Sequence, residues 1–280
     1  MGALGAGCSF SAGRDHRGPD APRAAGLDRP VRVAWVLGSG GPRGFTHVGV
    51  LKALAELALA PDLIVGASVG ALVGCLRASG LPAQQIETLA LDLQPLTLAR
   101  LAVGADERFS AEPLADLVRL AAPEQLLERM PVAMACVATQ RSDNALVAFT
   151  AGDAGLAVMA SSAIEGQLAP VQIRGQWYVD PDQQAPLPVR VARALGARRV
   201  LAVDASAHLE NAPPGAERYR EGDLRKQALV QADAGTADLV LKPNFGYWVS
   251  LSREFRERAI AAGYRDTLAQ AGALRTLHSG

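Results

Sequence analysis

The sequence predicts an α/β fold, a three-layer α/β/α sandwich with a central, mostly parallel sheet. Over residues 31–78 a strand, a helix, a second strand and a second helix follow one another, which is the order of a unit with parallel strands. Ala, Leu, Val and Gly are abundant and only 5% of residues are aromatic, which suits helices packed closely on a sheet. No internal repeat or linker divides the chain, so one domain over residues 31–280 is expected.

Length, charge and composition exclude several classes of protein. The 280 residues, 49% of them apolar, can bury a full-sized core. Because 28 basic residues balance 28 acidic ones, the chain lacks the basic surface that nucleic-acid binding requires. No apolar stretch reaches the roughly 18 residues of a membrane-spanning helix. Three cysteines do not make a disulfide framework, and Cys75 and Cys136, in apolar runs, are predicted to be buried thiols.

The first part of the chain changes character near residue 31. Residues 1–30 are rich in Gly, Ala, Pro, Ser and Arg without periodicity, and they are expected to form a disordered leader. The regular pattern that follows predicts strands at Val31–Leu37 and Leu63–Val65, helices at Phe45–Ala60 and Ser68–Ala78, and a glycine-rich loop at Gly38–Gly44.

The second part predicts a helical insert and then more strands. Pro82, Pro95, Pro113 and Pro123 divide residues 81–130 into short helices, whose apolar faces could belong to the core or to a lid at a lipid-entry surface. Further strands are expected at Val132–Thr139, Ala145–Phe149, Val171–Ile173, Trp177–Val179, Val200–Asp204 and Leu239–Leu241. Further helices are expected at Ala154–Ser162, Pro186–Leu195 and Arg253–Leu277, and a polar loop at residues 209–225.

The strongest chemical signal is the pentapeptide Gly66-Ala67-Ser68-Val69-Gly70, between a predicted strand and a predicted helix. In this context, G-x-S-x-G is typical of a nucleophile elbow, a tight turn that exposes a serine hydroxyl above a sheet. The small residues Gly66 and Gly70 allow the turn, and the amides at the start of the helix would lie near developing negative charge. Ser68 is therefore the candidate nucleophile.

A glycine-rich loop lies upstream, Gly38-Ser39-Gly40-Gly41-Pro42-Arg43-Gly44, and it also follows a strand and opens a helix. A dinucleotide-binding loop is disfavoured because Arg43 stands where G-x-G-x-x-G requires a glycine, and a P-loop is excluded because no Gly-Lys-Ser/Thr follows. The other interpretation is an oxyanion hole, in which bare backbone amides face an acyl oxyanion. Arg43 would hold this loop or add positive potential.

The third signal is Trp177-Tyr178-Val179-Asp180-Pro181, a hairpin strand that ends in an aspartate. Pro181 favours an extended conformation for Asp180, as expected at a strand end. From this pentapeptide alone, an ordinary Asp-Pro turn is the simpler interpretation. Trp177 and Tyr178 could line an acyl pocket or pack within the hairpin.

The three signals in this order resemble the patatin-like phospholipase family over about residues 31–205. The stretch Ser161–Gly166 and the hairpin Pro170–Asp180 are part of the resemblance. The family implies hydrolysis of acyl esters of lipids by a Ser-Asp dyad, without histidine, metal or organic cofactor.

Carried over by motif, the resemblance implies that Ser68 is the nucleophile and Asp180 the general base. It implies an oxyanion hole formed by the backbone amides of Gly40 and Gly41 with Arg43 beside them. An aspartate can take the serine proton if desolvation raises its pKa and geometry brings it within reach. The expected partner is a lipid or another acyl ester.

The sequence departs from the family pattern at several positions. Asp180-Pro181-Asp182 stands where the family has Asp-Gly, and a proline, which fixes φ and lacks an amide, could misaim the carboxylate of Asp180. The other departures replace a glycine by Ser39, a small residue by Pro42, a proline by Glu165 and an aromatic residue by Leu168. The alternative function is therefore a catalytically impaired, lipid-binding relative.

A Ser-His-Asp triad is the alternative mechanism. In the α/β-hydrolase order a histidine follows the acid, and His208 follows Asp204 at a predicted strand end. Against it, the glycine-rich loop lies much closer to the serine than in α/β-hydrolases, and an ordinary surface histidine is the simpler role for His208. His47 is expected to pack or to interact with a helix dipole. No His, Cys, Asp and Glu residues have the spacing of metal ligands.

The N-terminus leaves two locations open. Met1–Cys8 is too short for a signal peptide and lacks a basic region, so one expectation is a cytoplasmic protein with a featureless leader. Leu4–Cys8 resembles the end of a bacterial lipoprotein signal, which some bacterial members of the family carry. If the true start lies upstream, Cys8 would be lipidated and the protein anchored to a membrane in the periplasm.

Overall fold

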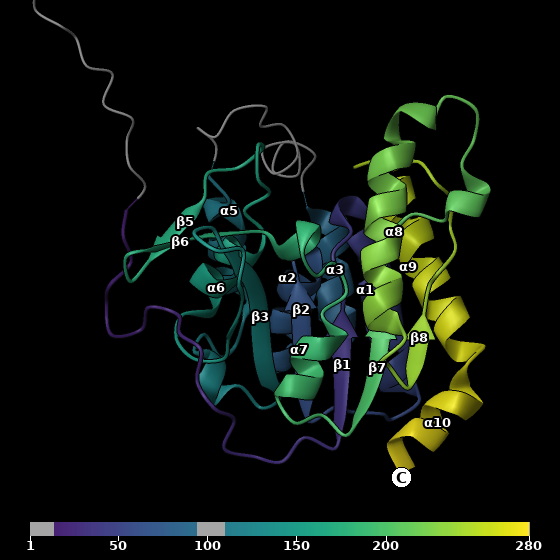
Figure 1. Cartoon of the computed structure of the whole chain (residues 1–280). Helices are drawn as coiled ribbons and strands as arrows, with labels where there is room; N and C mark the ends of the chain where they lie inside the picture. The colour runs from purple at the N-terminus through teal and green to yellow at the C-terminus, as the bar shows by residue number, and fades with distance from the viewer. Residues whose placement is uncertain (1–13, 94–109, 280) are drawn as a thin grey trace, which may run out of the picture.

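The computed structural model describes residues 14–93 and 110–279, and its strands form one eight-stranded sheet (Figure 1). Their order is β5-β6-β3-β2-β1-β7-β8, and β4 pairs with β3 beside this path. The strands are β1 Val33–Leu37, β2 Leu63–Ala67, β3 Ala133–Gln140, β4 Leu146–Phe149, β5 Val171–Ile173, β6 Gln176–Val179, β7 Arg199–Val203 and β8 Leu239–Leu241. β3, β2, β1, β7 and β8 are parallel, whereas β4, β5 and β6 pair antiparallel, so the sheet is mostly parallel as predicted.

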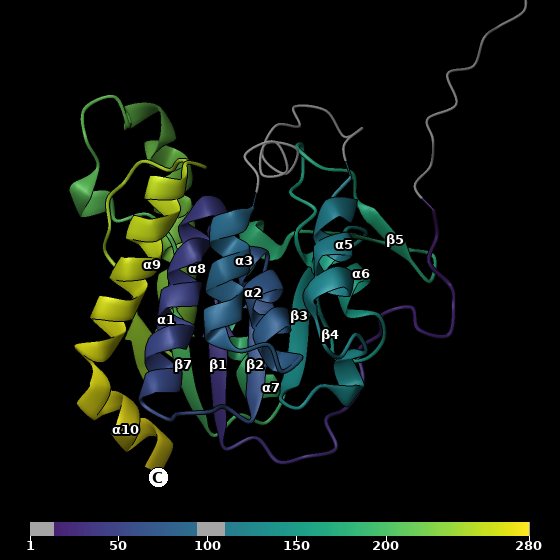
Figure 2. The ribbon, with the colours of Figure 1, turned by 180° about the vertical axis from the view of Figure 1, so that it is seen from behind.

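Helices cover both faces of the sheet, which confirms the predicted α/β/α sandwich (Figures 1 and 2). The face toward the viewer in Figure 1 carries α7 Val189–Ala194 and α8 Arg220–Ala234. The opposite face carries α1 Phe45–Glu56, α2 Val69–Ala78, α3 Ala83–Asp92, α5 Glu112–Ala121, α6 Ala154–Ser161 and α9 Arg253–Leu268, and α10 Ala271–Ser279 follows α9. Short 3-10 helices occupy Gly41–Gly44, Leu127–Arg129, Pro181–Gln183, Leu209–Asn211 and Glu217–Tyr219.

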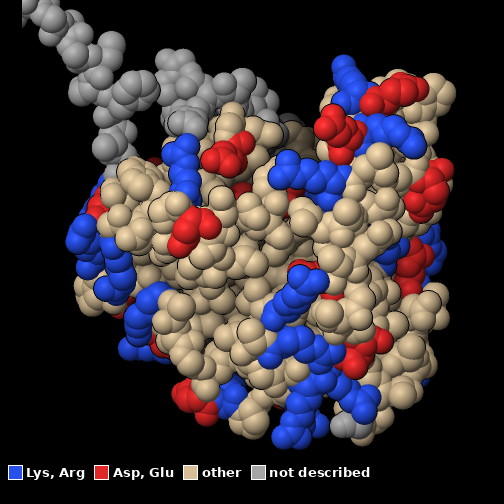
Figure 3. Space-filling view, viewed as in Figure 1, with Lys and Arg blue, Asp and Glu red and all other residues tan. Residues whose placement is uncertain are grey.

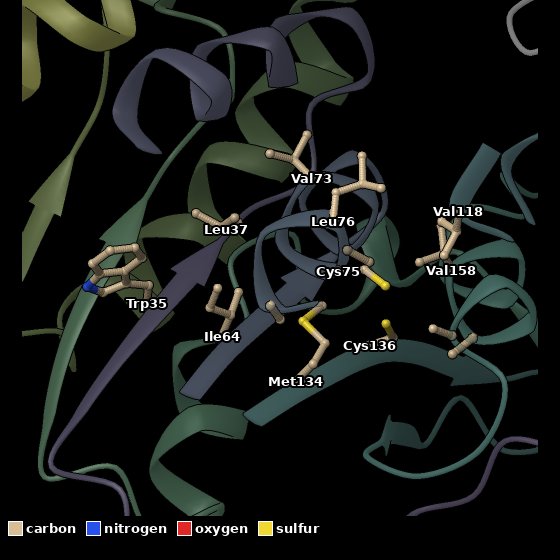
Figure 4. Close-up of a cluster of buried hydrophobic side chains, with 14 of the residues drawn as sticks. Trp35, Leu37, Ile64, Val73, Cys75, Leu76, Val118, Met134, Cys136 and Val158 are labelled. Carbon is tan, nitrogen blue, oxygen red and sulfur yellow. The ribbon is translucent and has the colours of Figure 1, made fainter. Parts of the chain in front are cut away.

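The sheet separates two apolar clusters. Trp35 belongs to the larger cluster, which fills the side of α1 and α2 (Figure 4). The next residue, Val36, belongs to the smaller cluster under α7 and α8. Neighbouring residues of a strand point to opposite faces, so a strand that is buried on both faces must be apolar throughout. Burial of β1 on both faces therefore explains the continuous apolar run at Val31–Leu37.

The two cysteines expected to be buried thiols are buried and unoxidised. Cys75 of α2 and Cys136 of β3 point toward one another in the larger cluster (Figure 4). The hydrogen bond with Cys75 and burial raise the pKa of Cys136 well above its ordinary value, so the thiol stays protonated.

Residues 14–30, expected to belong to a disordered leader, form ordered contacts instead. Isolated bridges join His16 to Ile173 and Arg23 to Ala151. These contacts are backbone pairings with the rest of the fold, which need no apolar periodicity, so the pattern of the sequence did not indicate them. The packed body therefore starts before residue 31. Cys8 lies outside the described residues.

Two expectations for the C-terminal part are also corrected. The expected loop over residues 209–225 contains the start of α8, whose buried residues are only Val230 and Asp233. A helix with so narrow an apolar stripe gives no clear periodic signal. The single closing helix expected over residues 253–277 is divided into α9 and α10.

The surface carries both signs of charge (Figure 3). Basic side chains gather over α7, where Arg190 pairs with Asp233 at 3.0 Å and Arg193 with Asp238 at 2.8 Å. These arginines are thus partly neutralised by neighbouring carboxylates. Within residues 14–93 and 110–279, none of the helices combines the length and the apolar character needed to span a bilayer.

Candidate active site

The register of the sheet brings the two strongest sequence signals together. β4 pairs along one edge of β3, so β2 and β6 share the other edge end to end. The last residue of β2 pairs with Val137, and the last residue of β6, which runs the opposite way, pairs with Thr139. The two strands therefore end on either side of Ala138. The residues that follow them are Ser68 and Asp180.

Ser68 occupies a tight turn between β2 and α2, as expected of a nucleophile elbow. Its φ is +55°, a left-handed conformation that residues other than glycine rarely adopt. Gly70 packs so closely on β1 that a Cβ there would lie 2.1 Å from the carbonyl oxygen of Leu37. A Cβ at Gly66 would lie 2.5 Å from the Cα of Ala71. Both glycines of the motif are therefore required by close packing.

The glycine-rich loop lies beside this elbow because it follows β1, which pairs in parallel with β2. Gly41 has φ +52° and lines the same pocket as Ser68. At Gly40 a Cβ would lie 2.7 Å from the carbonyl oxygen of Ala205. The amides of Gly40 and Gly41 donate no hydrogen bond to another described residue. Free backbone amides beside a serine hydroxyl can stabilise an oxyanion.

Asp180 is buried beside Ser68, and its two carboxylate oxygens differ in their contacts. Its Oδ1 accepts a hydrogen bond from the amide of Asp182 at 2.9 Å, whereas its buried Oδ2 has no well-formed hydrogen bond to a described residue. Burial raises the pKa of Asp180 to about 7, and the charge of Asp182 adds to the rise. The Ser68 hydroxyl, the Asp182 amide and the Lys226 ammonium oppose it. Such a carboxylate can accept a proton near neutral pH.

Pro181, the main departure from the family pattern, is accommodated by a short helix. It is the first residue of the 3-10 helix Pro181–Gln183, a position at which a missing amide costs no hydrogen bond. The carboxylate of Asp180 caps this helix by accepting a hydrogen bond from the next amide, that of Asp182. Asp180 itself has φ −55° and ψ 135°, the extended conformation favoured before proline.

The sequence predicts only a packing or dipole role for His47, and the structure gives it a specific partner. Its Nε2 lies 2.8 Å from the carbonyl oxygen of Gly38, at the start of the glycine-rich loop. Burial lowers the pKa of His47 to about 4, although the bond to Gly38 and the charge of Asp204 oppose this. His47 is therefore a neutral hydrogen-bond donor that holds the loop.

The end of α6 and the residues that follow it contact both sides of the site. Ser161 accepts a hydrogen bond from the amide of Ser68 at 3.0 Å, and the carbonyl of Ala163 accepts one from the amide of Asp180 at 2.9 Å. Between them, the buried Ser162 hydroxyl lines the pocket and has no hydrogen-bond partner among the described residues. In the sequence, Ser161–Gly166 stands out only as part of the family resemblance, which does not indicate these contacts with Ser68 and Asp180.

An apolar pocket of about 360 Å³ adjoins Ser68. Its apolar lining includes Phe45, Leu72, Leu76, Ile86, Leu114 and Leu168. The described flanks of the expected helical insert thus form part of its wall, and residues 94–109 lie outside the described residues. Tyr178 instead packs on Phe149 within the sheet, with ring centroids 5.0 Å apart. A pocket of this composition suits a hydrocarbon chain.

Arg43 reaches from the glycine-rich loop to a distant segment. Its guanidinium donates to the carbonyl of Tyr247 and lies 5.7 Å from the centre of the Tyr247 ring. Burial lowers the pKa of Arg43, and the charge of Asp223 opposes this. Of the two roles expected for Arg43, these contacts favour holding the loop.

The structure does not assemble the alternative triad. The Nδ1 of His208 lies 2.7 Å from Glu210 and its Nε2 lies 3.1 Å from the carbonyl of Pro243. Asp204 instead pairs with Lys242 at 3.5 Å. Both nitrogens of His208 are therefore engaged away from the serine, and the residue is buried rather than on the surface. Among the described residues, no group of three or more His, Cys, Asp and Glu could hold a metal ion.

Several known proteins are similar to this chain. An uncharacterized NTE family protein of Mycobacterium tuberculosis is 32% identical over 224 residues, 79% of this chain and 61% of that protein. Lysophospholipase NTE1 of Mycosarcoma maydis is 28% identical over 226 residues, 72% of this chain and 11% of that protein. This chain thus spans about three fifths of its mycobacterial relative and a small part of the fungal one.

A solved structure and a family model complete the comparison. VipD from Legionella pneumophila shares the fold with a TM-score of 0.53 at 13% identity, over 95% of this chain and 72% of that chain. The family model described as patatin-like phospholipase matches residues 35–192, more than half of this chain. The chain therefore belongs to the patatin-like phospholipase family.

Proposed function

We propose that this protein is a serine acyl-hydrolase that cleaves carboxyl esters of lipids, with Ser68 as nucleophile and Asp180 as general base. The observation that carries the proposal is the buried Asp180, whose Oδ2 has no well-formed hydrogen bond among the described residues, beside a serine held at φ +55° on the wall of an apolar pocket. The family supports the same reaction class, and one relative is named a lysophospholipase.

The reaction would proceed through an acyl-enzyme. The Ser68 hydroxyl attacks the ester carbonyl carbon while its proton passes to Asp180, and the amides of Gly40 and Gly41 stabilise the oxyanion. Collapse of the intermediate expels the alcohol, which takes the proton from Asp180. Water then gives a proton to Asp180 and attacks the acyl-enzyme, which releases the carboxylic acid and restores Ser68. The chain's own residues handle every proton, so the proposal includes no metal ion or organic cofactor.

The pocket supports a lipid as the source of the acyl chain. Its walls are apolar, so a hydrocarbon chain would gain from burial there. Val249 both lines this pocket and is 45% exposed, and its neighbour Trp248 is 47% exposed. A peripheral contact of these two residues with a lipid surface would bring substrate to the pocket.

The alternative of lipid binding without turnover depends on the Asp-Pro departure. The contacts of this segment do not favour it, because Oδ1 of Asp180 caps the short helix by accepting a hydrogen bond from the amide of Asp182, while Oδ2 has no well-formed hydrogen bond among the described residues. Turnover by the purified protein distinguishes the two functions directly.

The test is hydrolysis of p-nitrophenyl butyrate and octanoate by the wild type and three variants. Ser68→Ala and Asp180→Asn should each lower kcat/KM at least about 10²-fold, because each removes a group that bonds or moves a proton in the transition state. His208→Ala should stay close to the wild type. If the wild type does not exceed Ser68→Ala, the proposal is wrong and lipid binding becomes the better function. If His208→Ala is as inactive as Ser68→Ala, the dyad is wrong.

A further inference from the structure

A hydrogen-bonded cluster joins the Asp180 loop to the glycine-rich loop and to α8. The Oδ1 of Asp182 accepts hydrogen bonds from the Lys226 ammonium at 2.6 Å and from the Ser39 hydroxyl. The amide of the same residue donates to Oδ1 of Asp180 at 2.9 Å. Asp182 therefore connects three elements, and one of them carries the proposed base.

One member of this cluster, Ser39, is a departure from the family pattern, and it donates a hydrogen bond to Asp182. Ser39 stands where glycine is common, and Asp182 follows the unusual Pro181. A glycine at position 39 would have no hydroxyl to donate, so the contact requires this departure. The third member, Lys226, is one of only three lysines in the chain and lies on α8.

The same cluster determines the charge beside Asp180. The charged side chains that act on Asp180 are Asp182, which disfavours its ionised form, and Lys226, which favours it. Both are partly shielded from water, with side chains 32% and 22% exposed. Because Lys226 and Asp182 pair with each other, removal of either leaves an uncompensated charge next to the base.

We propose that Ser39, Asp182 and Lys226 form a positioning clasp that holds the Asp180 loop against the glycine-rich loop and balances the charge beside Asp180. This inference depends on the proposed function, in which Asp180 is the base. The three residues act through Asp180 and the loop rather than on the ester, so they are positioning residues.

The test is the pH dependence of kcat/KM on the soluble ester p-nitrophenyl butyrate. In the wild type, kcat/KM should fall at low pH because Asp180 becomes protonated. The midpoint of this fall, the acidic limb of the profile, should lie at the pKa of Asp180, about 7. Lys226→Met removes the favourable cation and should move the limb upward by about one pH unit. Asp182→Asn removes the unfavourable anion and should move it downward by about as much. Lys226→Arg keeps the charge and should restore the wild-type limb.

Two further variants separate charge from general damage. Lys242→Met makes the same chemical change at a lysine that pairs with a buried aspartate, Asp204, and should leave the limb in place. Ser39→Ala removes one hydrogen bond of the clasp without changing a charge. It should lower kcat by about two- to tenfold and leave the limb in place.

The clasp is wrong if the acidic limbs of Lys226→Met and Asp182→Asn both stay at the wild-type pH. It is also wrong if the two limbs move in the same direction. A merely structural role would lower Tm and kcat together and would not move the limb. If the wild type shows no turnover above Ser68→Ala, the proposed function fails while the clasp can still be tested. The pH dependence of thermal unfolding, measured against Asp180→Asn, then reports the titration of Asp180. An unchanged titration in Lys226→Met overturns the clasp.

Discussion

His47 beneath the glycine-rich loop and Asp180 in the facing loop are buried almost equally, at 0% and 5% exposure, yet burial prepares them for different tasks. Loss of water favours the neutral form of each. The pKa of His47 therefore falls to about 4, and that of Asp180 rises to about 7. Near neutral pH the histidine has a fixed, uncharged state, whereas the aspartate can exchange its proton.

The comparison shows that burial alone does not make a base. His47 uses Nε2 on a carbonyl of the loop, so its position and protonation state are both fixed. The Oδ2 of Asp180 has no well-formed hydrogen bond among the described residues, the Ser68 hydroxyl interacts with the carboxylate, and the pKa of about 7 lies where a general base is most effective. In the proposed mechanism this available oxygen, and not the degree of burial, separates the base Asp180 from the structural residue His47.

The largest expected effect is on the rate. Asp180→Asn should lower kcat/KM by about 10²- to 10⁴-fold, because an amide cannot accept the serine proton. His47→Gln, which can still donate to the carbonyl of Gly38, should lower kcat/KM by less than about tenfold. Steady-state kinetics on p-nitrophenyl butyrate measures both. Equal losses in the two variants would mean that His47 and Asp180 do not differ in their roles in the reaction.

The next effect is on stability, and it has opposite signs at the two residues. The pKa of Asp180 is about 7 in the fold against an ordinary value of 3.8, so the fold favours its protonated form. Its contribution to the free energy of unfolding is therefore complete below about pH 4 and is lost as pH rises through 7. The pKa of His47 is about 4 against 6.5, so its contribution is complete above 6.5 and is lost as pH falls through 4. Each slope reaches at most about 1.4 kcal/mol per pH unit.

Urea unfolding of the single variants between these limits separates the two contributions, which oppose each other in the wild type. Asp180→Asn, which retains the histidine, should gain stability as pH rises from about 4 to 6.5. His47→Gln, which retains the aspartate, should lose stability over a similar range. Parallel slopes in the two variants would show that one of the two pKa values does not depart from its ordinary value in this direction.

The sequence was sufficient for the features that depend on local spacing. Gly66, Ser68 and Gly70 lie within one turn between a strand and a helix, so their pattern encodes the elbow directly. The glycine-rich loop is encoded in the same way. The parallel order of β1 and β2 followed from the alternation of strands and helices.

Other parts depend on contacts between distant residues and could not be read locally. The pentapeptide around Asp180 is compatible with an ordinary turn, and only the pairing of β6 with β3 brings it beside Ser68. α8 has too narrow an apolar stripe to be recognised, so Lys226 gave no signal in the sequence. The partner of Arg43 is the backbone of Tyr247, which no side-chain pattern can indicate.

The substitution Gly70→Ala tests the close packing of the elbow without changing any charge. Gly70→Ala should lower the free energy of unfolding by about 1 to 3 kcal/mol, because its Cβ would lie 2.1 Å from a backbone oxygen of β1. Gly222→Ala, on α8, is the matched control: beyond its own helix, none of the described residues has an atom within 4 Å of its Cβ, and it should raise stability by up to about 1 kcal/mol. Urea unfolding measures both. A Gly70→Ala protein as stable as the wild type would mean that the elbow does not need this close approach.

A small change in rate is expected for Arg43→Met, and its size decides whether the glycine-rich loop contributes charge or only backbone amides. Because the guanidinium donates to the carbonyl of Tyr247, its loss should loosen the loop and lower kcat/KM by less than about tenfold. Loss of a true oxyanion donor would cost about 10²- to 10³-fold. Arg258→Met is the matched control, since Arg258 donates to the carbonyl of the nearby Phe245 at 3.2 Å. Similar small losses in both variants would mark Arg43 as a tether, whereas a loss of 10²-fold or more in Arg43→Met alone would place its charge in the oxyanion hole.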